Sequence, residues 1–153
     1  MVSVSERLAE LQITLPAVAA PVAAYVPAVR TGDQVWTSGQ LPFVDGGLAV
    51  TGKVGAEVTA EEAEGLARTA VLNALAAVDA LVGIDKVTRV LKIVGFVASA
   101  EGFTGQPAVV NGASNLIGEV FGEAGAHARS AVGVAELPLG APVEVELIVE
   151  IAD

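Results

Sequence analysis

Residues 143–151 alternate strictly between aliphatic and mainly acidic side chains, and this pattern constrains the fold more than any other feature of the chain. Side chains of a β-strand point alternately to the two faces of a sheet. One face therefore carries Val143, Val145, Leu147, Val149 and Ile151. The other face carries Glu144, Glu146, Ile148 and Glu150. The chain must accordingly build a sheet with one buried face and one face rich in carboxylates.

A second strand precedes this one, and a turn rich in proline and glycine is predicted to join the two. Arg129 opens that second strand. A guanidinium is a natural partner for a carboxylate, because its N–H groups can form two parallel hydrogen bonds. Glu144 and Glu146 should lie roughly 6.5–7 Å apart along their strand. Two interpretations are open: a site built from Arg129 and a glutamate on the adjacent strand, or a solvated face beside an incidental arginine.

Composition predicts a single domain that associates with copies of itself. The chain has 153 residues, of which 53% are hydrophobic and 4% aromatic, so the core is built from Ala, Val and Leu. Charged residues make up 17%, below the usual quarter. A chain this apolar often covers part of its surface with a partner subunit. We therefore expect a homo-oligomer.

Charge and residue usage exclude several classes of function. The net charge of −10, with eight basic residues, argues against a nucleic-acid partner, because phosphate backbones are bound by clustered Lys and Arg. The absence of Cys and the single His argue against thiol chemistry and against a metal centre built on cysteine or histidine. Residues 11–29 are uncharged, but Pro16, Pro21 and Pro27 would break a membrane-spanning helix there. We expect a cytoplasmic protein with no cofactor, no metal and no membrane partner.

The predicted elements follow the order β-β-α-β-α-β-β after a short helix at residues 5–11. Strands are expected at residues 25–29 and 34–38, around a turn at 31–33, with a short extended piece at 48–54. A capping box formed by Thr59 and Glu62 opens a helix that ends near Gly83. Residues 87–97 are apolar on both faces, which predicts a central strand.

A second helix is expected at residues 106–121, where Gly112 and Gly118 suggest close packing. The fold class is α+β, a mixed sheet with two helices packed on one face. The other face should then be covered by a second subunit.

Individual polar residues each admit a structural and a functional interpretation. His127 is the only histidine, and no G-x-S-x-G motif provides a serine nucleophile, so His127 is expected at a surface or interface. Ser38 ends a strand and either binds a ligand or caps a turn. Tyr25 either caps the core or forms a functional hydrogen bond. Asn111 and Asn115 are typical of a helix surface.

Two motifs resemble the signatures of the YjgF/RidA (reactive intermediate deaminase) family. The C-terminal motif comprises Ala128-Arg129-Ser130, Leu137-Pro138 and Val143-Glu144-Val145-Glu146. The N-terminal motif is Thr37-Ser38-Gly39-Gln40-Leu41-Pro42, with Tyr25 upstream at the family's spacing. The resemblance covers residues 21–153, so residues 1–153 are interpreted as one such domain in which 1–20 form an N-terminal helical extension.

This resemblance implies a chorismate-mutase-like fold, assembled as a homotrimer with clefts between subunits. Family members that carry the arginine hydrolyse reactive enamines and imines, such as 2-aminoacrylate, to 2-keto acids and ammonia. By resemblance, Arg129 would bind the substrate carboxylate and Glu144 would hold the attacking water. Tyr25, Ser38 and Gly39 would line the cleft. The family's asparagine on the second helix corresponds to Asn111 or Asn115, and spacing leaves the two open.

The sequence departs from the family pattern at several positions, which is typical of a longer, divergent branch. The family's Pro-Tyr-Ser-Gln-Ala reads here as residues 24–28, Ala-Tyr-Val-Pro-Ala, and Ala131 replaces a common cysteine. The hypothesis is a cofactor-free deaminase of small 2-imino acids. Its alternatives are a non-catalytic trimeric protein that binds small carboxylates, a chorismate-mutase-like isomerase, and an endoribonuclease, against which the negative charge argues.

Overall fold

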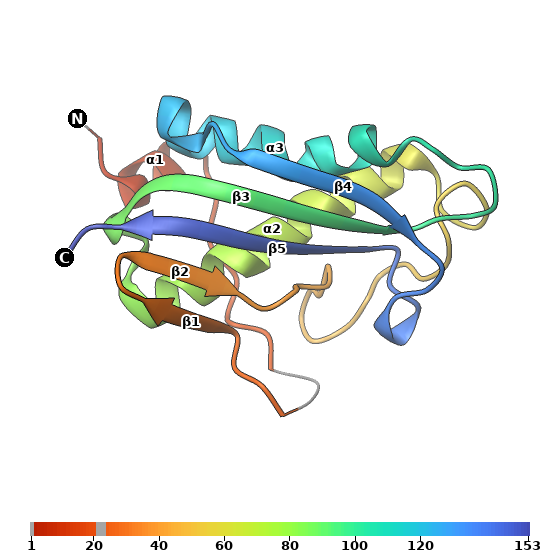
Figure 1. Cartoon of the computed structure of the whole chain (residues 1–153), viewed down its shortest axis with the longest axis horizontal. Helices are drawn as coiled ribbons and strands as arrows, with labels where there is room; N and C mark the ends of the chain where they lie inside the picture. Colours follow the sequence, from red (N-terminus) through yellow and green to blue (C-terminus); the bar gives the residue numbers. More distant parts are fainter. Residues whose placement is uncertain (1, 21–23) are drawn as a thin grey trace.

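A five-stranded sheet forms one layer of the molecule and two long helices form the other (Figure 1). The computed structural model describes residues 2–20 and 24–153. Pro21, one of the prolines expected to interrupt the uncharged run, lies outside the described residues. The strands are β1 (Ala28–Thr31), β2 (Gln34–Thr37), β3 (Val87–Ala98), β4 (Ala128–Val134) and β5 (Val143–Ile151). The helices are α1 (Val4–Glu10), α2 (Ala60–Val82) and α3 (Gln106–Phe121), with short 3₁₀ turns η1 (Ile84–Lys86), η2 (Gly122–Gly125) and η3 (Pro138–Gly140).

The strand order β1-β2-β5-β3-β4 places β3 between the two C-terminal strands. The expectation that β4 and β5 are adjacent is therefore wrong. The reason is the connection through α3, which crosses over so that β4 pairs with β3 in parallel. β5 then returns antiparallel on the other side of β3. The prediction of a central strand at 87–97 is confirmed.

Helix α2 begins and ends where the sequence predicts. The Thr59 hydroxyl accepts a hydrogen bond from the backbone N–H of Glu62 at 3.1 Å, and the Glu62 carboxylate accepts one from the Thr59 N–H at 3.3 Å. Gly83 ends the helix with φ of 88°. The buried Asn73 side chain of α2 donates to the carbonyls of Leu41 and Phe43, and so it holds the loop after β2 over the helix.

Helix α3 packs closely on α2, as its glycines suggest, but only one of them is responsible. A Cβ at Gly112 would collide with the backbone carbonyl of Glu64 on α2, whereas a Cβ at Gly118 would meet nothing within 4 Å. Both helices lie on the same face of the sheet, which confirms the predicted layering (Figure 1). The other face exposes apolar side chains, among them Trp36 at 47% and Val132 at 43%.

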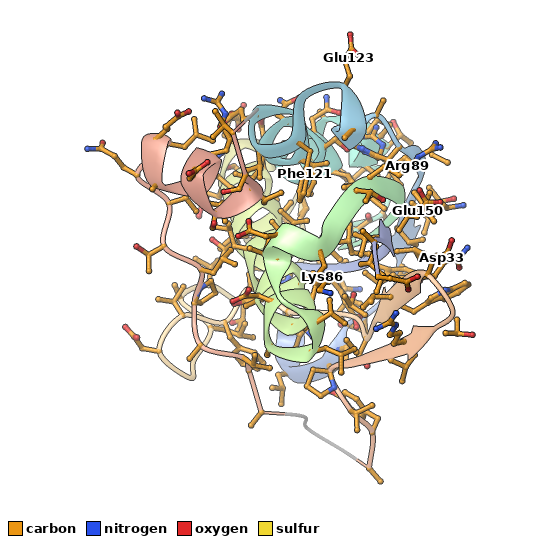
Figure 2. All side chains as sticks on the ribbon, turned by 90° about the vertical axis from the view of Figure 1, so that its left-hand side faces the viewer. Asp33, Lys86, Arg89, Phe121, Glu123 and Glu150 are labelled. Atoms are coloured by element: carbon orange, nitrogen blue, oxygen red, sulfur yellow. The ribbon has the colours of Figure 1, made fainter. Side chains whose placement is uncertain are left out.

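The predicted hairpin is confirmed, although its first strand is shorter than expected. β1 and β2 pair antiparallel, with Thr31 opposite Gln34. Because β1 begins at Ala28, Tyr25 lies in the segment before the strand. Residues 48–54 form no strand; Val54 makes isolated bridges to Val58 and Ser99. Figure 2 views the sheet from the end at which Arg89 of β3 pairs with Glu150 of β5.

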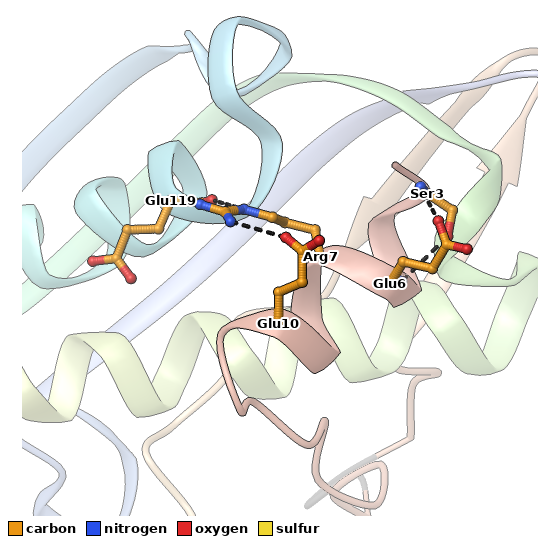
Figure 3. A network of polar contacts seen from close by, with 5 residues as sticks. All are labelled: Ser3, Glu6, Arg7, Glu10 and Glu119. Atoms are coloured by element: carbon orange, nitrogen blue, oxygen red, sulfur yellow. Dashed lines mark hydrogen bonds and ion pairs between the residues drawn. The ribbon is translucent and has the colours of Figure 1, made fainter. Parts of the chain in front are cut away.

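The N-terminal helix is anchored to the rest of the domain by specific contacts. Its capping box joins Ser3 and Glu6 (Figure 3). The Arg7 side chain donates to the Glu119 carbonyl of α3 at 3.0 Å and to the Glu10 carboxylate at 3.1 Å (Figure 3). The backbone and hydroxyl of Ser5 both donate to the Asp85 carboxylate at 2.7 Å. The extension therefore docks at one end of the helical layer.

Candidate active site

Four of the predicted site residues line one pocket of about 360 Å³: Tyr25, Ser38, Gly39 and Glu144. They come from the segment before β1, from the end of β2 and from the start of β5. Apolar groups form most of the remaining wall: Ala19, Ala20, Pro27, Leu41, Phe43 and Pro138. The pocket thus combines a carboxylate with a wall built mainly of apolar side chains.

The backbone around Gly39 explains how Glu144 reaches the pocket. Beyond the end of β2 the chain stays beside β5, because Gln40 and Val145 exchange two backbone hydrogen bonds at 2.8 and 3.0 Å. A Cβ at Gly39 would collide with the carboxyl group of Glu144. Glycine therefore makes the space that the carboxylate occupies.

Ser38 fastens the opposite wall of the pocket. Its hydroxyl donates to the Val26 carbonyl at 2.6 Å, and its backbone N–H donates to the Pro27 carbonyl at 2.8 Å. These bonds hold the segment that carries Tyr25 against the end of β2. The sequence left two roles open for Ser38, to bind a ligand or to cap a turn. The structure shows the hydrogen bonds of the second role, and Ser38 also lines the pocket.

The carboxyl group of Glu144 is electrostatically unusual. Burial raises its pKa above the ordinary value of 4.5, because the charged form loses solvation. The neighbouring Glu146 carboxylate raises the pKa of Glu144 further through like-charge repulsion. Perturbed carboxyl groups that line a pocket are candidates for proton transfer.

Arg129 does not line this pocket. It lies on the helix-covered side of the sheet. It pairs with Ile93, a fully buried residue of β3, so its side chain shares the face on which α3 packs. Its Nη1 donates to Asn111 Oδ1 at 2.7 Å and to Ser114 Oγ at 3.3 Å, and its Nη2 donates to the Pro107 carbonyl at 3.4 Å. Asn111, and not Asn115, is thus the asparagine beside the arginine.

Arg129 and Glu144 do not meet within one chain. β3 separates their strands, and the register offsets them by three positions, which places their Cα atoms roughly 14 Å apart. Glu144 pairs with Phe96 on the face opposite Arg129. The expected pairing of Arg129 with a glutamate on the adjacent strand is therefore wrong for a single chain.

Sequence reasoning missed two groups near these residues. His127 forms hydrogen-bond contacts with Ser114 Oγ at 2.9 Å and the Gly125 carbonyl at 2.6 Å. The i to i+3 spacing of Asn111 and Ser114 could have indicated that both share one face of α3. Ala19 and Ala20, which belong to the extension, carry no signal in the sequence for their place in the pocket wall.

Within residues 2–20 and 24–153, no group of three or more His, Asp or Glu side chains could hold a metal ion.

The domain, with its mixed five-stranded sheet and two packed helices, has a chorismate-mutase-like fold. Residues 5–151 match the family described as "YjgF/chorismate mutase-like, putative endoribonuclease". The chain belongs to this family, as its motifs suggest.

Three proteins are similar to the chain over most of its length. Protein TCP17 of Trypanosoma cruzi is 49% identical over 150 residues, 97% of this chain and 94% of the relative. The crystal structure of the Agrobacterium tumefaciens protein Atu1372, of unknown function, is 48% identical with a TM-score of 0.89, covering 97% of this chain and 92% of that one. A 2-iminobutanoate/2-iminopropanoate deaminase of Dermatophagoides farinae is 34% identical over 140 residues, 91% of this chain and 94% of the relative.

Proposed function

We propose that the protein hydrolyses reactive 2-enamine and 2-imino acids to 2-keto acids and ammonia, without a cofactor. The observation that carries this proposal is the half-buried Glu144 carboxyl group, of raised pKa, facing a largely apolar pocket of about 360 Å³. A site of this size suits a small substrate. The name of the Dermatophagoides farinae relative supports the same reaction.

The reaction requires only a positioned water and proton transfer. 2-Aminoacrylate, CH2=C(NH2)COO⁻, takes a proton from solvent at its methylene carbon and becomes the iminium ion, CH3–C(=NH2⁺)–COO⁻. Water then adds to the C2 atom of the iminium ion while the Glu144 carboxylate accepts a proton from that water. The Glu144 carboxylic acid returns this proton to the amino group of the carbinolamine, ammonia leaves, and the hydroxyl proton returns to solvent as pyruvate forms. One water is consumed, and no group is oxidised or reduced.

Arg129 has the chemistry to hold the substrate carboxylate. Of the five N–H donors of a guanidinium, the three bonds to Asn111, Ser114 and Pro107 use both hydrogens of Nη1 and one of Nη2. Considering the described residues alone, the Nε–H and the second Nη2–H remain for a ligand. These two donors lie on neighbouring nitrogens of one planar group, which suits the two oxygens of a carboxylate.

The separation of Arg129 from Glu144 leads us to place the complete site between subunits of a homotrimer. Arg129 of one chain would then meet the Glu144 pocket of the next. The apolar groups on the open face of the sheet, among them Trp36, Val29 and Val132, offer a surface for such assembly. Their exposure in a single chain supports the expected homo-oligomer.

Keto-acid release tests the proposed reaction. 2-Aminoacrylate and related imines are generated in situ by an amino-acid dehydratase or oxidase, and the release of keto acid is followed with and without the protein. At imine concentrations well below KM, wild type should accelerate it, whereas Arg129→Ala and Glu144→Gln should abolish the acceleration while each still unfolds in a cooperative thermal transition. A wild-type rate equal to the spontaneous rate for every imine would refute the proposal.

A second candidate, a non-catalytic protein that binds small carboxylates, is favoured by the orientation of Arg129. It requires Arg129 but not Glu144, so Glu144→Gln would bind a stable keto acid such as pyruvate as tightly as wild type, with no turnover in either. The endoribonuclease activity in the family description fits the chain less well, because a net charge of −10 repels a phosphate backbone. Any RNA cleavage should disappear on further purification.

A further inference from the structure

We propose that Ser114 and His127 form a positioning pair that orients the guanidinium of Arg129 toward the substrate carboxylate. This inference rests on the proposed role of Arg129 as the carboxylate-binding group. It is carried by a continuous series of hydrogen-bond contacts: Arg129 Nη1 to Ser114 Oγ at 3.3 Å, Ser114 Oγ to His127 Nε2 at 2.9 Å, and His127 Nδ1 to the Gly125 carbonyl at 2.6 Å.

The backbone carbonyl of Gly125 sets the direction of every bond in this series. A carbonyl oxygen only accepts, so Nδ1 of His127 carries the proton. In the neutral imidazole Nε2 is then the acceptor, and the Ser114 hydroxyl donates to it. The remaining lone pairs of Ser114 Oγ are left to accept from Arg129 Nη1. The tautomer of His127 therefore determines that Ser114 presents an acceptor, and not a donor, to the arginine.

Ser114 Oγ is the second acceptor that binds Nη1 of the guanidinium. Asn111 Oδ1 alone, at 2.7 Å, would allow the planar group to rotate about that single contact. A second acceptor on the same nitrogen fixes the plane, and the long bond from Nη2 to the Pro107 carbonyl assists it. The Nε–H and the second Nη2–H then point in a fixed direction. A binding group held in this way loses less rotational freedom when its ligand arrives.

Both members of the pair come from elements that the fold brings to one edge of the sheet. Ser114 lies on α3 one turn after Asn111, and His127 lies in the short connection between η2 and β4, two residues before Arg129. Both side chains are partly buried and stand outside the hydrophobic core. Their removal therefore costs little core area, and we expect the effect to fall on ligand binding.

The test separates substrate binding from turnover. Arg129 would bind the substrate carboxylate equally in the ground and transition states, because that group does not react, so loosening Arg129 should raise KM and leave kcat nearly unchanged. We expect Ser114→Ala and His127→Ala each to raise KM about 3- to 10-fold, the range of one net hydrogen bond. The dissociation constant of pyruvate should rise by a similar factor. Ser114→Thr, which keeps the hydroxyl, should restore both values.

Thr69→Val provides the matched control, because its hydroxyl donates to the Gly65 carbonyl within α2 and takes no part in this series. It should change neither KM nor the pyruvate dissociation constant. Unchanged KM and pyruvate affinity in both Ser114→Ala and His127→Ala, with normal thermal transitions, would overturn the inference. So would a loss of kcat at constant KM.

The pyruvate measurement keeps this inference distinct from the proposed function. If wild type binds pyruvate but converts no imine, the deaminase proposal fails while the positioning role still stands or falls on pyruvate affinity. Ser114→Ala and His127→Ala act at opposite ends of the same contact. If one variant fails to fold, the KM and pyruvate affinity of the other still test the inference.

Discussion

Gly39 and Glu144 depend on each other at the level of single residues. The carboxyl group occupies the space that a side chain at position 39 would fill. The backbone exchange between Gln40 and Val145 fixes the two segments at this short separation. Glu144, the proposed base, can therefore take this position only because residue 39 has no Cβ.

Replacing Gly39 by alanine should therefore displace the Glu144 carboxylate. We expect kcat/KM for imine hydrolysis to fall about 10- to 100-fold, because misplacing a reacting group by an ångström has effects of this size. The fold should persist, since the group that must move is the end of a flexible side chain. Gly47→Ala is the control, because a Cβ there meets nothing within 4 Å. Equal activity of Gly39→Ala and wild type would contradict the assignment of Glu144.

The raised pKa of Glu144 makes a second prediction, for stability. Between the ordinary value of 4.5 and the higher pKa of the folded state, the folded protein binds more protons than the unfolded chain. The contribution of Glu144 to the free energy of unfolding therefore falls as pH rises through this window. Glu144→Gln removes this term, so its stability relative to wild type should increase across the window and level off above it. Urea unfolding between about pH 4 and about pH 8 measures the difference; a difference independent of pH would contradict the shift.

At the scale of elements, patterns local in sequence predicted more than contacts between distant segments. The capping box at Thr59 and the alternation along β5 specify their elements directly, because a helix end and a strand face depend on neighbouring residues. The separation of β4 from β5 depends on the crossover through α3, which no local pattern encodes. The choice of Asn111 over Asn115 likewise depends on the register of α3 against β4.

The two glycines of α3 allow the close packing of the helices to be measured. Gly112→Ala should lower the free energy of unfolding by about 1–3 kcal/mol, because its Cβ would press on the Glu64 backbone. Gly118→Ala should raise it by about 0.5–1 kcal/mol, because alanine is the better helix former and space is open there. Denaturant unfolding of the two variants measures both changes in the free energy of unfolding. A stabilised Gly112→Ala protein would show that the helices are further apart.

At the scale of the whole molecule, the positions of Arg129 and Glu144 require a decision between two kinds of site. Either one chain supplies both groups after a large rearrangement, or two chains supply one group each. The first alternative requires a side chain to pass from one face of the sheet to the other across β3. The second leaves the fold unchanged and uses the exposed apolar groups of the open face.

Mixing inactive subunits distinguishes these alternatives. Arg129→Ala and Glu144→Gln chains are unfolded, combined in equal amounts and refolded, so that mixed oligomers form. If each site takes Arg129 from one chain and Glu144 from its neighbour, roughly a quarter of the sites contain both native groups by random assortment. Activity should then recover to roughly a quarter of wild type. If one chain supplies both groups, no chain in the mixture has a complete site, and activity stays absent.

A second mixture makes the result quantitative. Wild-type chains are refolded with an equal amount of chains that carry both substitutions. A site within one chain predicts roughly half of the wild-type activity, because half of the chains are complete, whereas a site shared by neighbours again predicts roughly a quarter. Combining the folded proteins without the unfolding step controls for slow exchange. The two mixtures together therefore assign the site to one chain or to two without reference to how fast the wild-type protein turns over.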